Sequence, residues 1–471
     1  MRGEVDRRIL FDYLSEEVLR QQPPDVADFL LDSSILSRLE ARECDAALGR
    51  SDSENRIKWL EQQCLFVART GDGSLRYHRL FREFLLQHLA RDLERLEALH
   101  RRAAAYFEAQ GNPDGAIFHR LEAGDHREAA RLIAALAADM IRAGRFEALT
   151  FWLGRLSEGE FAEFPQLSLH WGQMCESRGQ WDQALEHYEQ AAQAYSARGD
   201  LLGLSDVLRS KGHLLDWRKG DHVEAERLHR EALSYVGEAH HRKRAALLAS
   251  LARDQLSAGN TTAAQTLYRE ALAIYEAEAD RAGQLESLLN PGSWLYHSLG
   301  DYLQALAVLR RAEQLALELN DSPQLAETYN NMAVNLYFLG RYAECLDCAG
   351  RALEISRALG DSHQEAFALM NQANGLEATC GLSYAGLYRQ YQRALNAEQA
   401  LGNQRFIIAT LVFMMIFARR GGDPSEAIRR GHQALPLARE RSLPWLAGFA
   451  LVQLGAAQIL RTRDPAHLLH R

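Results

Sequence analysis

The stretch DSPQLAETYNNMAVNLYFLGRYAECLDCAGRALEISRALGD, residues 321–361, decides the fold. Apolar side chains recur at spacings of three and four over Leu325–Tyr337, which predicts an amphipathic helix with one stripe to bury against a neighbour. Gly340 can end that helix in a left-handed conformation that other residues resist. Asp321 and Asp361 each stand three residues before a glutamine, so each is expected to cap a helix start.

This unit recurs along the chain. Turns of the form glycine, polar residue, then aromatic or polar residue are 41, 39, 41 and 40 residues apart, at Gly179, Gly220, Gly259, Gly300 and Gly340. A weaker turn stands at Gly421–Asp423, two periods after Gly340, with a degenerate one near Cys380–Gly381 between them. Small alanines keep the same phase, at Ala191, Ala232, Ala271, Ala312, Ala352, Ala394 and Ala434. Two independent landmarks with one period predict an all-α solenoid of stacked helix pairs.

The pattern resembles the tetratricopeptide repeat: paired antiparallel helices, glycine turns, and alanines where helices approach closely. The unit here is about 40 residues rather than about 34, which adds roughly 9 Å of helix. Long repeats of this kind resemble the sensor region of MalT-like bacterial regulators. The resemblance covers roughly residues 166–460, and we expect tetratricopeptide-like repeats over 166–471.

Residues 1–92 do not follow this period. Helical segments, among them Phe11–Gln22 and Leu36–Leu48, precede two short segments, Leu65–Ala68 and Ser74–His78, that flank an Asp-Gly turn. Two such segments around that turn predict a β-hairpin. Helices followed by a hairpin predict a winged-helix module.

Three runs in this region resemble the winged helix that follows the ATPase in the MalT family. They are FLLDSSIL at 29–36, LEQQCLF at 60–66 and RYHRLFREFL at 76–85. That family belongs to the STAND class of signalling switches, which typically carry a nucleotide-binding module, a winged helix, a repeat sensor and an output domain. Residues 93–165 fit the helical connector of such proteins, with half-repeats.

Two parts of that architecture have no counterpart in this sequence. It contains no Gly-x-x-x-x-Gly-Lys-Ser/Thr loop to cradle a triphosphate. Its last 50 residues stay repeat-like rather than forming a DNA-reading helix-turn-helix. The resemblance therefore implies the winged-helix and sensor portion of a LuxR-type regulator, without the ATPase and DNA-binding ends. An ATPase module outside this chain is an expected partner, and whether the chain is a natural product or a fragment is open.

Composition narrows the setting. A net charge of −9 argues against a protein that coats nucleic acid, and the basic run Arg242–Arg244 is short, so we do not expect direct DNA binding. Six scattered cysteines fit a reducing cytoplasm better than a disulfide scaffold. The most apolar stretch, Phe406–Ala418, is too short to span a membrane and predicts a buried helix.

One residue is a candidate site through the family resemblance. In related switches a histidine within Met-His-Asp-Leu contacts the nucleotide diphosphate. Tyr77–Leu80 matches that motif only at His78 and Leu80. His78 is therefore a candidate nucleotide-state sensor in a full-length parent. The alternative is a histidine at a helix start, satisfied by packing and water.

Other residue types suggest no site of their own. A zinc site needs about four ligands, and Cys345 and Cys348 have no second pair beside them, so we expect buried thiols. We find no nucleophile–base pair, and predict neither catalytic residues, a metal nor a cofactor. Six of the seven tryptophans fall mostly at helix-pair positions, where core packing is the default and some are expected to line a groove; the six are Trp152, Trp171, Trp181, Trp217, Trp294 and Trp445.

Two functions stay open. The first is a regulatory, non-enzymatic sensor that binds a protein or small-molecule inducer on the repeat solenoid. The alternative is a free-standing tetratricopeptide scaffold for protein–protein interaction. A nucleotide-independent, stoichiometric protein partner would favour the scaffold. DNA binding by residues 1–92 is a third hypothesis, which rests on fold analogy alone. The ligand, the binding face and the oligomeric state are not specified by the sequence.

Overall fold

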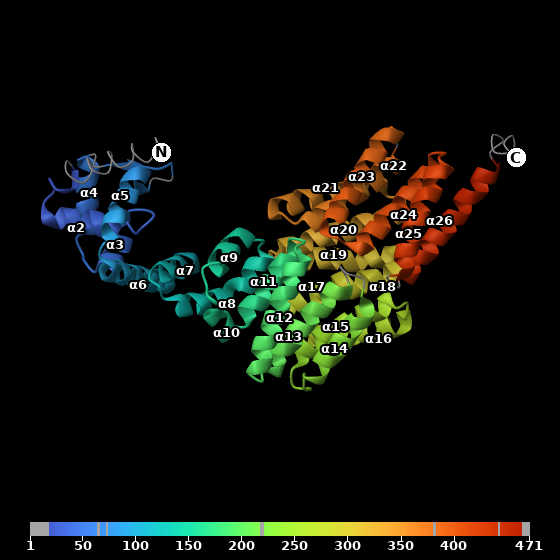
Figure 1. Ribbon diagram of the computed structural model, residues 1–471, viewed down its shortest axis with the longest axis horizontal. Coiled ribbons are helices and arrows are strands. Elements are labelled where there is room, and N and C mark those ends of the chain that lie inside the picture. The colour runs from blue at the N-terminus through green and yellow to red at the C-terminus, as the bar shows by residue number, and fades with distance from the viewer. Residues whose placement is uncertain are drawn as a thin grey trace. The chain divides into compact units, whose positions relative to one another are not determined.

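The computed structural model describes residues 18–63, 66–71, 74–216, 221–379, 383–440 and 443–463 (Figure 1). They form two compact units: residues up to 136 together with 151–160, and residues 137–150 together with 161 onward. Several predicted features fall partly or wholly outside the described residues. These are the segment Phe11–Gln22, Cys64, the middle of the hairpin turn, Trp217, Gly220, the turn at Cys380–Gly381 and the side chain of Trp445.

The first unit opens with three helices, a hairpin and a fourth helix. These elements are α2 (Pro24–Ser33), α3 (Ala41–Leu48), α4 (Ser53–Gln62), β1 (Val67–Arg69), β2 (Leu75–Tyr77) and α5 (Arg79–Leu89). The strands are antiparallel, with Val67 opposite Tyr77. The apolar faces of the helices meet in a core whose members include Phe29, Leu60 and Phe81, all buried. The predicted hairpin and winged helix are confirmed.

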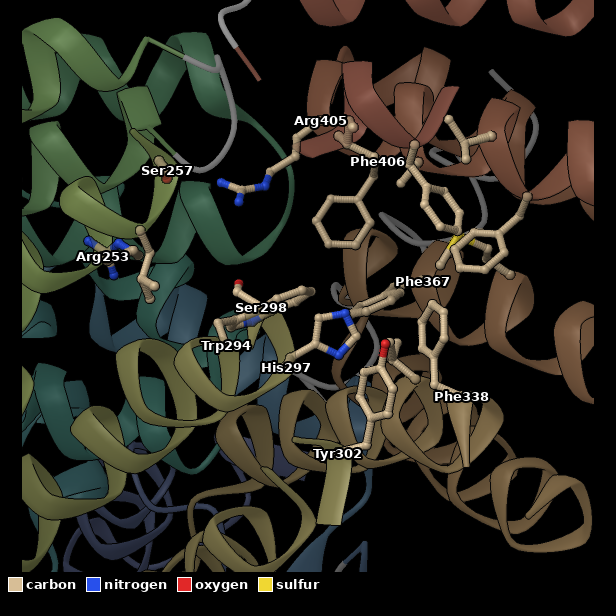
Figure 2. Close-up of a pocket in the computed structure, with 18 residues that line it drawn as sticks. Arg253, Ser257, Trp294, His297, Ser298, Tyr302, Phe338, Phe367, Arg405 and Phe406 are labelled. Atoms are coloured by element: carbon tan, nitrogen blue, oxygen red, sulfur yellow. The ribbon is translucent and has the colours of Figure 1, made fainter. Parts of the chain in front are cut away.

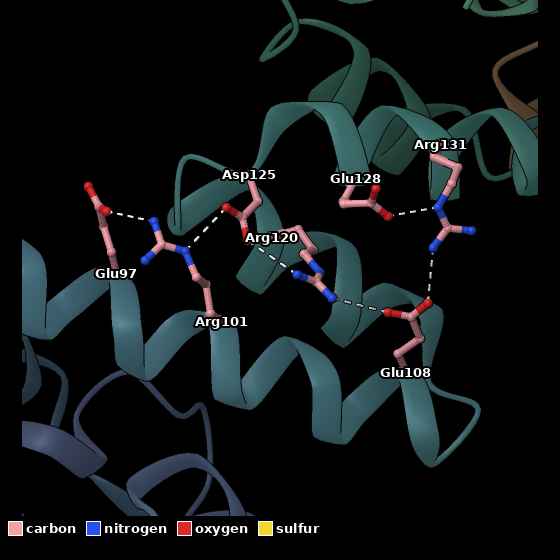
Figure 3. Close-up of polar contacts among 7 residues, drawn as sticks. All are labelled: Glu97, Arg101, Glu108, Arg120, Asp125, Glu128 and Arg131. Carbon is pink, nitrogen blue, oxygen red and sulfur yellow. Dashed lines mark hydrogen bonds and ion pairs between the residues drawn. The ribbon is translucent and has the colours of Figure 1, made fainter.

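Five helices follow: α6 (Leu93–Ala109), α7 (Pro113–Glu122), α8 (His126–Arg142), α9 (Phe146–Leu153) and α10 (Glu158–Glu163). A chain of ion pairs joins α6 to the start of α8 (Figure 3). It runs through Glu97, Arg101, Asp125, Arg120, Glu108, Arg131 and Glu128, with oxygen–nitrogen distances of 2.8–3.4 Å. Four acidic and three arginine side chains take part, and their ion pairs join α6, α7 and the start of α8. The predicted borders at residues 92 and 165 stay predictions.

The second unit is an array of helix pairs. Its early members are α11 (Gln166–Ser177), α12 (Trp181–Ala197), α13 (Leu201–Leu214), α14 (His222–Ser234), α15 (His241–Ser257) and α16 (Thr261–Ala277). Its later members are α19 (Tyr302–Leu319), α20 (Ser322–Phe338), α21 (Tyr342–Leu359), α22 (Ser362–Ala378), α23 (Tyr384–Leu401), α24 (Gln404–Arg420), α25 (Pro424–Glu440) and α26 (Pro444–Arg463). The predicted solenoid is confirmed.

Between these groups lies one interrupted helix. It consists of α17 (Arg281–Ser287), a π-helical segment η3 (Leu288–Gly292) and α18 (Ser293–Ser298). Pro291 lies inside the π segment. Proline has no N–H to give to the helix ladder, so a local change of helix type accommodates it. The segment immediately precedes Trp294 and His297, which line the cavity described below.

The landmarks of the repeat behave as expected. Gly340 has a φ of 75°, and the turn glycines 179, 259 and 300 are left-handed as well. In the last turn it is Gly422 rather than Gly421 that takes the left-handed conformation. All seven in-phase alanines are fully buried. Asp321 and Asp361 cap α20 and α22 by accepting backbone N–H groups at 3.1 and 3.0 Å.

Phe406–Ala418 forms most of α24, and nearly all of this stretch is buried, as predicted. Among the described residues, no helix combines the length and apolar character needed to cross a bilayer. Within the second unit, the turn before α12 touches the end of α23, where Gly179 lies against Leu401. The array therefore curves far enough for an early repeat to meet a late one.

Candidate functional site

A cavity of about 310 Å³ lies on the inner side of the repeat array (Figure 2). Residues of α15, α18, α19, α20, α22, α24 and α26 line it, and all of these except α19 belong to the first helices of successive repeats. The cavity thus belongs to the second unit alone. A volume of this size is at the lower end of what small-molecule sites occupy, roughly 300–1,000 Å³.

Aromatic rings make up much of its wall. Tyr302 and Phe338 stack with their centroids 5.0 Å apart, and His297 meets Phe338 edge-on at 5.3 Å. On the other side Phe367 and Phe406 meet edge-on at 4.6 Å. Such offset and edge-to-face arrangements suit a flat apolar guest, which can add one more ring to the set.

The charged groups of the wall gather on one side. Arg253 of α15 is only 5% exposed, and Arg405 of α24 only 8%. Figure 2 shows Arg405 reaching toward the side of the cavity that holds Ser257 and Arg253. Burial lowers the pKa of Arg405, because the charged guanidinium loses solvation. None of the described residues in the wall is acidic.

One carboxylate stands behind Ser257. Asp216 is 1% exposed; it accepts a hydrogen bond from the Ser257 hydroxyl at 3.4 Å, and its Oδ2 lies 3.8 Å from Nε of Arg253. That separation exceeds a hydrogen bond. Within the described part of the chain, Nε and Nη2 of Arg253 have no hydrogen-bond partner.

Two other acidic residues nearby, Asp254 and Glu286, already have polar partners. Asp254 meets Nδ1 of His229 at 2.6 Å, and the other ring nitrogen of His229 lies 3.1 Å from the carbonyl oxygen of Arg209. Burial raises the pKa of Asp254. Glu286 pairs with Arg209 at 2.7 Å. These pairs fix α13, α14, α15 and α17 to one another.

A second hollow, about 250 Å³ in volume, shares Arg253 with the cavity but has a polar wall. Two pairs lie in its wall: Arg209 with Glu286, and His213 with Glu176 at 3.0 Å. The hollow extends from α11 to α22 along the inner side of the array. Its polar wall, in which acidic side chains outnumber arginines, contrasts with the aromatic cavity.

The structure places His78 at the N-cap of α5, exposed, and its side chain makes no capping hydrogen bond. Its backbone N–H donates to the carbonyl oxygen of Phe66 at 2.6 Å. These contacts fit the helix-start alternative. The nucleotide-sensor role stays a prediction for a longer parent.

Cys345 and Cys348 are buried, as expected. Burial raises the pKa of the Cys345 thiol to about 12 and that of Cys348 to about 11. The Cys345 thiol donates to the carbonyl oxygen of Asn371 at 3.8 Å. A search of the described residues finds no cluster of three or more histidine, cysteine or acidic side chains placed to hold a metal.

Of the tryptophans, Trp294 lines the cavity, while Trp152 and Trp181 are buried. Sequence reasoning did not single out Arg253, Arg405 or the phenylalanines of the cavity wall. The spacing of the repeat could have pointed to some residues of the cavity wall. Trp294 and Val334 stand one period of 40 residues apart, and both face the cavity.

Comparisons with known proteins agree with the two parts of the chain. The MalT winged helix domain matches residues 15–97, and the tetratricopeptide repeat matches residues 165–236, 211–277 and 283–358. The HTH-type transcriptional regulator MalT of Klebsiella pneumoniae is 31% identical over 229 residues, which are 48% of this chain and 25% of the relative.

Two further similarities are weaker or partial. The serine/threonine-protein kinase PknK of Mycobacterium tuberculosis is 34% identical over 128 residues, 26% of this chain and 12% of the relative. A crystal structure of a STAND protein with a tetratricopeptide repeat sensor from Pyrococcus horikoshii aligns with a TM-score of 0.57 at 15% identity, covering 93% of this chain and 67% of that one. That likeness shows the fold. The chain spans about a quarter of the length of the MalT relatives that it matches.

Proposed function

We infer from its MalT winged helix and tetratricopeptide repeats that this MalT-like protein is the sensing portion of a regulator of transcription, and that it binds an inducer on the repeat array. The proposal assigns the chain a binding role rather than a catalytic one. The winged helix would pass the state of the sensor to a nucleotide-binding module such as STAND proteins carry. Such signalling belongs in the cytoplasm.

One observation carries the proposal: the aromatic cavity on the inner side of the array. Seven helices, from α15 to α26, contribute described residues to its wall, so a bound molecule contacts distant parts of the array at once. Stacked repeats can change their curvature by small rotations between neighbours. A ligand that fits one curvature better than another shifts the population toward that form.

The contact between Gly179 and Leu401 depends on the curvature of the array, so a change of curvature would make or break it. It joins the start of the array to a late repeat. A ligand held between α15 and α24 stabilises the same curved form that brings this contact together. Occupancy of the cavity and closure of the array are then linked by one equilibrium.

Thermal unfolding of the full chain against a metabolite library tests the proposal. A ligand at about 100 times its Kd adds about 2.7 kcal/mol to the free energy of unfolding, which raises the melting temperature measurably. The half-buried Ala409 lines the cavity, so Ala409→Trp fills it and should abolish the shift. The matched control is Ala263→Trp on the exposed face of α16, which should keep it.

Two results would contradict the proposal: no compound that raises the melting temperature of the native chain, or a shift that survives unchanged in Ala409→Trp. A second candidate function, the free-standing scaffold, is favoured by the polar hollow, whose charged wall suits a peptide segment of a partner protein. Capture of one stoichiometric protein partner, blocked by Glu286→Gln but not by Ala409→Trp, would support the scaffold instead.

A further inference from the structure

We propose that the cavity takes a small carboxylic acid with an aromatic body, its carboxylate held by Arg253 and Arg405 and its ring by the aromatic wall. The inference rests on the proposed function, because it names the chemical class of the inducer. Three observations support it. They are the charge of the cavity wall, the N–H groups of Arg253 that have no partner among the described residues, and the aromatic character of the remaining wall.

The charge is argued from the wall itself. Among the described residues of the wall, Arg253 and Arg405 are the cationic side chains and none is acidic. His297 is the remaining titratable histidine of the wall; burial lowers its pKa, so it is neutral at pH 7. Its Nδ1 lies 3.1 Å from Oδ1 of Asn335. An anion is the guest that such a wall complements.

The acidic residues behind the wall do not remove the preference of the cavity for an anion. Asp216 approaches Arg253 to 3.8 Å and stands behind Ser257. Asp254 is held by His229, and Glu286 by Arg209. Asp216 therefore faces Arg253 as an ion pair, but at 3.8 Å it leaves the Nε of Arg253 without a hydrogen bond. A buried charge that lacks full compensation is costly, so a second carboxylate from a ligand is favourable there.

Arg253 supplies the clearest unused groups. It is about nineteen-twentieths buried, yet its Nε and Nη2 have no hydrogen-bond partner among the residues that the structure describes. A guanidinium presents its N–H donors as a planar fork that matches the two oxygens of a carboxylate. Buried donors left without acceptors are rare in folded proteins, which points to an acceptor that the bound state provides.

The aromatic body of the ligand is inferred from the other residues of the cavity wall. Away from the arginines, the cavity is lined by rings such as Phe338, Phe367, Phe406 and Phe413. These groups offer no hydrogen bonds to the hydroxyls of a sugar or to a peptide backbone. An aromatic ring buries its apolar area here and gains edge-to-face contacts as well.

The test uses the full chain and two probes of the same shape, 2-naphthylacetate and 2-naphthylacetamide, measured by titration calorimetry. We expect the carboxylate to bind at least about tenfold more tightly, since charge-assisted hydrogen bonds are stronger than neutral ones. Arg405→Met and Arg253→Met should each remove the preference. Arg230→Met is the matched control, because Arg230 is 65% exposed on α14, and it should keep the preference.

Equal binding of the two probes to the native chain would overturn the inference, and this comparison needs no variant to fold. A preference that persists in Arg405→Met would overturn it too, as would the absence of binding by both probes. These failures are distinct from failure of the proposed function. If neutral library compounds still raise the melting temperature of the native chain but not of Ala409→Trp, the sensor proposal stands and the anionic ligand class is wrong.

Discussion

Gly179 lies directly against Leu401: a side-chain carbon added at Gly179 would come within 2.5 Å of Cδ2 of Leu401. Gly144 stands against Leu359 in the same way. Each pair joins a turn near the start of the second unit to the end of a late helix. These two close contacts bring the start of the second unit against late repeats, and a side chain at either glycine would have to displace a leucine methyl group.

Replacing Gly179 by alanine should therefore cost more than its backbone conformation alone. Gly179 has a φ of 75° and Gly300 has a φ of 76°, but Gly300 has open space around it. We expect Gly300→Ala to lower the free energy of unfolding by about 1 kcal/mol, from the left-handed backbone. Gly179→Ala should lower it by roughly a further 1–3 kcal/mol through overpacking. Urea unfolding followed by circular dichroism measures both.

A second substitution separates the cost of the left-handed backbone from the cost of overpacking. Leu401→Ala removes the opposing methyl groups, so Gly179→Ala should cost no more in that background than Gly300→Ala does in the native chain. If the two glycine variants have equal effects in the native chain, closure at this contact is not a constraint on the array.

Ala279 is a point of backbone strain that can be relieved. Its φ is 51°, and the next residue, Asp280, caps α17 by accepting the N–H of Gly283 at 3.0 Å. The equivalent positions before other caps carry Gly199, Asn320, Gly360 and Gly402. Because alanine resists this conformation, Ala279→Gly should raise the free energy of unfolding by about 1 kcal/mol.

The matched control is two residues away. Ala277 is exposed in the last turn of α16, where the backbone is helical. There, Ala277→Gly should lower the free energy of unfolding by about 0.5–1 kcal/mol. The same sign for both variants would mean that position 279 is not strained.

Local signals made much of this fold predictable. A glycine turn such as Gly340 and a cap such as Asp361 each depend on a few neighbouring residues. Their conformations therefore follow from the short segment that contains them. Ala279 shows the limit, because its left-handed conformation is imposed by the turn between two repeats and its residue type gives no sign of it.

The cavity was less accessible to sequence reasoning. Arg253 and Arg405 meet at the same cavity because the array curves, and that curvature is the sum of many small rotations between repeats. No short motif encodes such a sum. The apolar run Phe406–Ala418 was rightly expected to be buried, but nothing local shows that its first residues face a cavity rather than a packed core.

A buried amide cluster links two consecutive repeats at Asn330. The Asn330 amide group donates to Oε1 of Gln364 at 2.8 Å and to the Gln364 carbonyl oxygen at 3.1 Å. The Asn371 amide group in turn donates to the carbonyl oxygen and Oδ1 of Asn330. All three residues are buried. Replacing Asn330 by leucine strands polar groups of both partners, so we expect a loss of roughly 2–4 kcal/mol in the free energy of unfolding.

Asn396→Leu is the control for that change of residue type, since Asn396 is exposed on α23. It should alter the free energy of unfolding by less than about 0.5 kcal/mol. The combination Asn330→Leu with Asn371→Leu should cost less than the sum of its parts, because the second change removes a group that the first one stranded. Strict additivity would show that the cluster does not act as a unit.

His100 and His119 form a buried pair in the first unit, with their Nδ1 atoms 2.8 Å apart and each residue 4% exposed. Burial lowers the pKa of His100 to about 4 and that of His119 to about 3. An unfolded chain has histidine pKa values near 6.5, so below that pH the unfolded state binds more protons than the folded one. The stability that the neutral pair contributes is fully present above about pH 6.5 and is lost as the pH falls toward 4.

Between pH 7 and pH 4.5 this pair alone should lower the free energy of unfolding by roughly 3–5 kcal/mol. Carboxylates titrate in part of the same range, so the measurement is the difference between the native chain and the double variant His100→Asn, His119→Gln, followed by urea unfolding at several pH values. The variant should lose less stability than the native chain as the pH falls. His78→Gln, at an exposed position, should follow the native curve. If the double variant also runs parallel to the native chain, the buried pair is not what makes the first unit sensitive to acid.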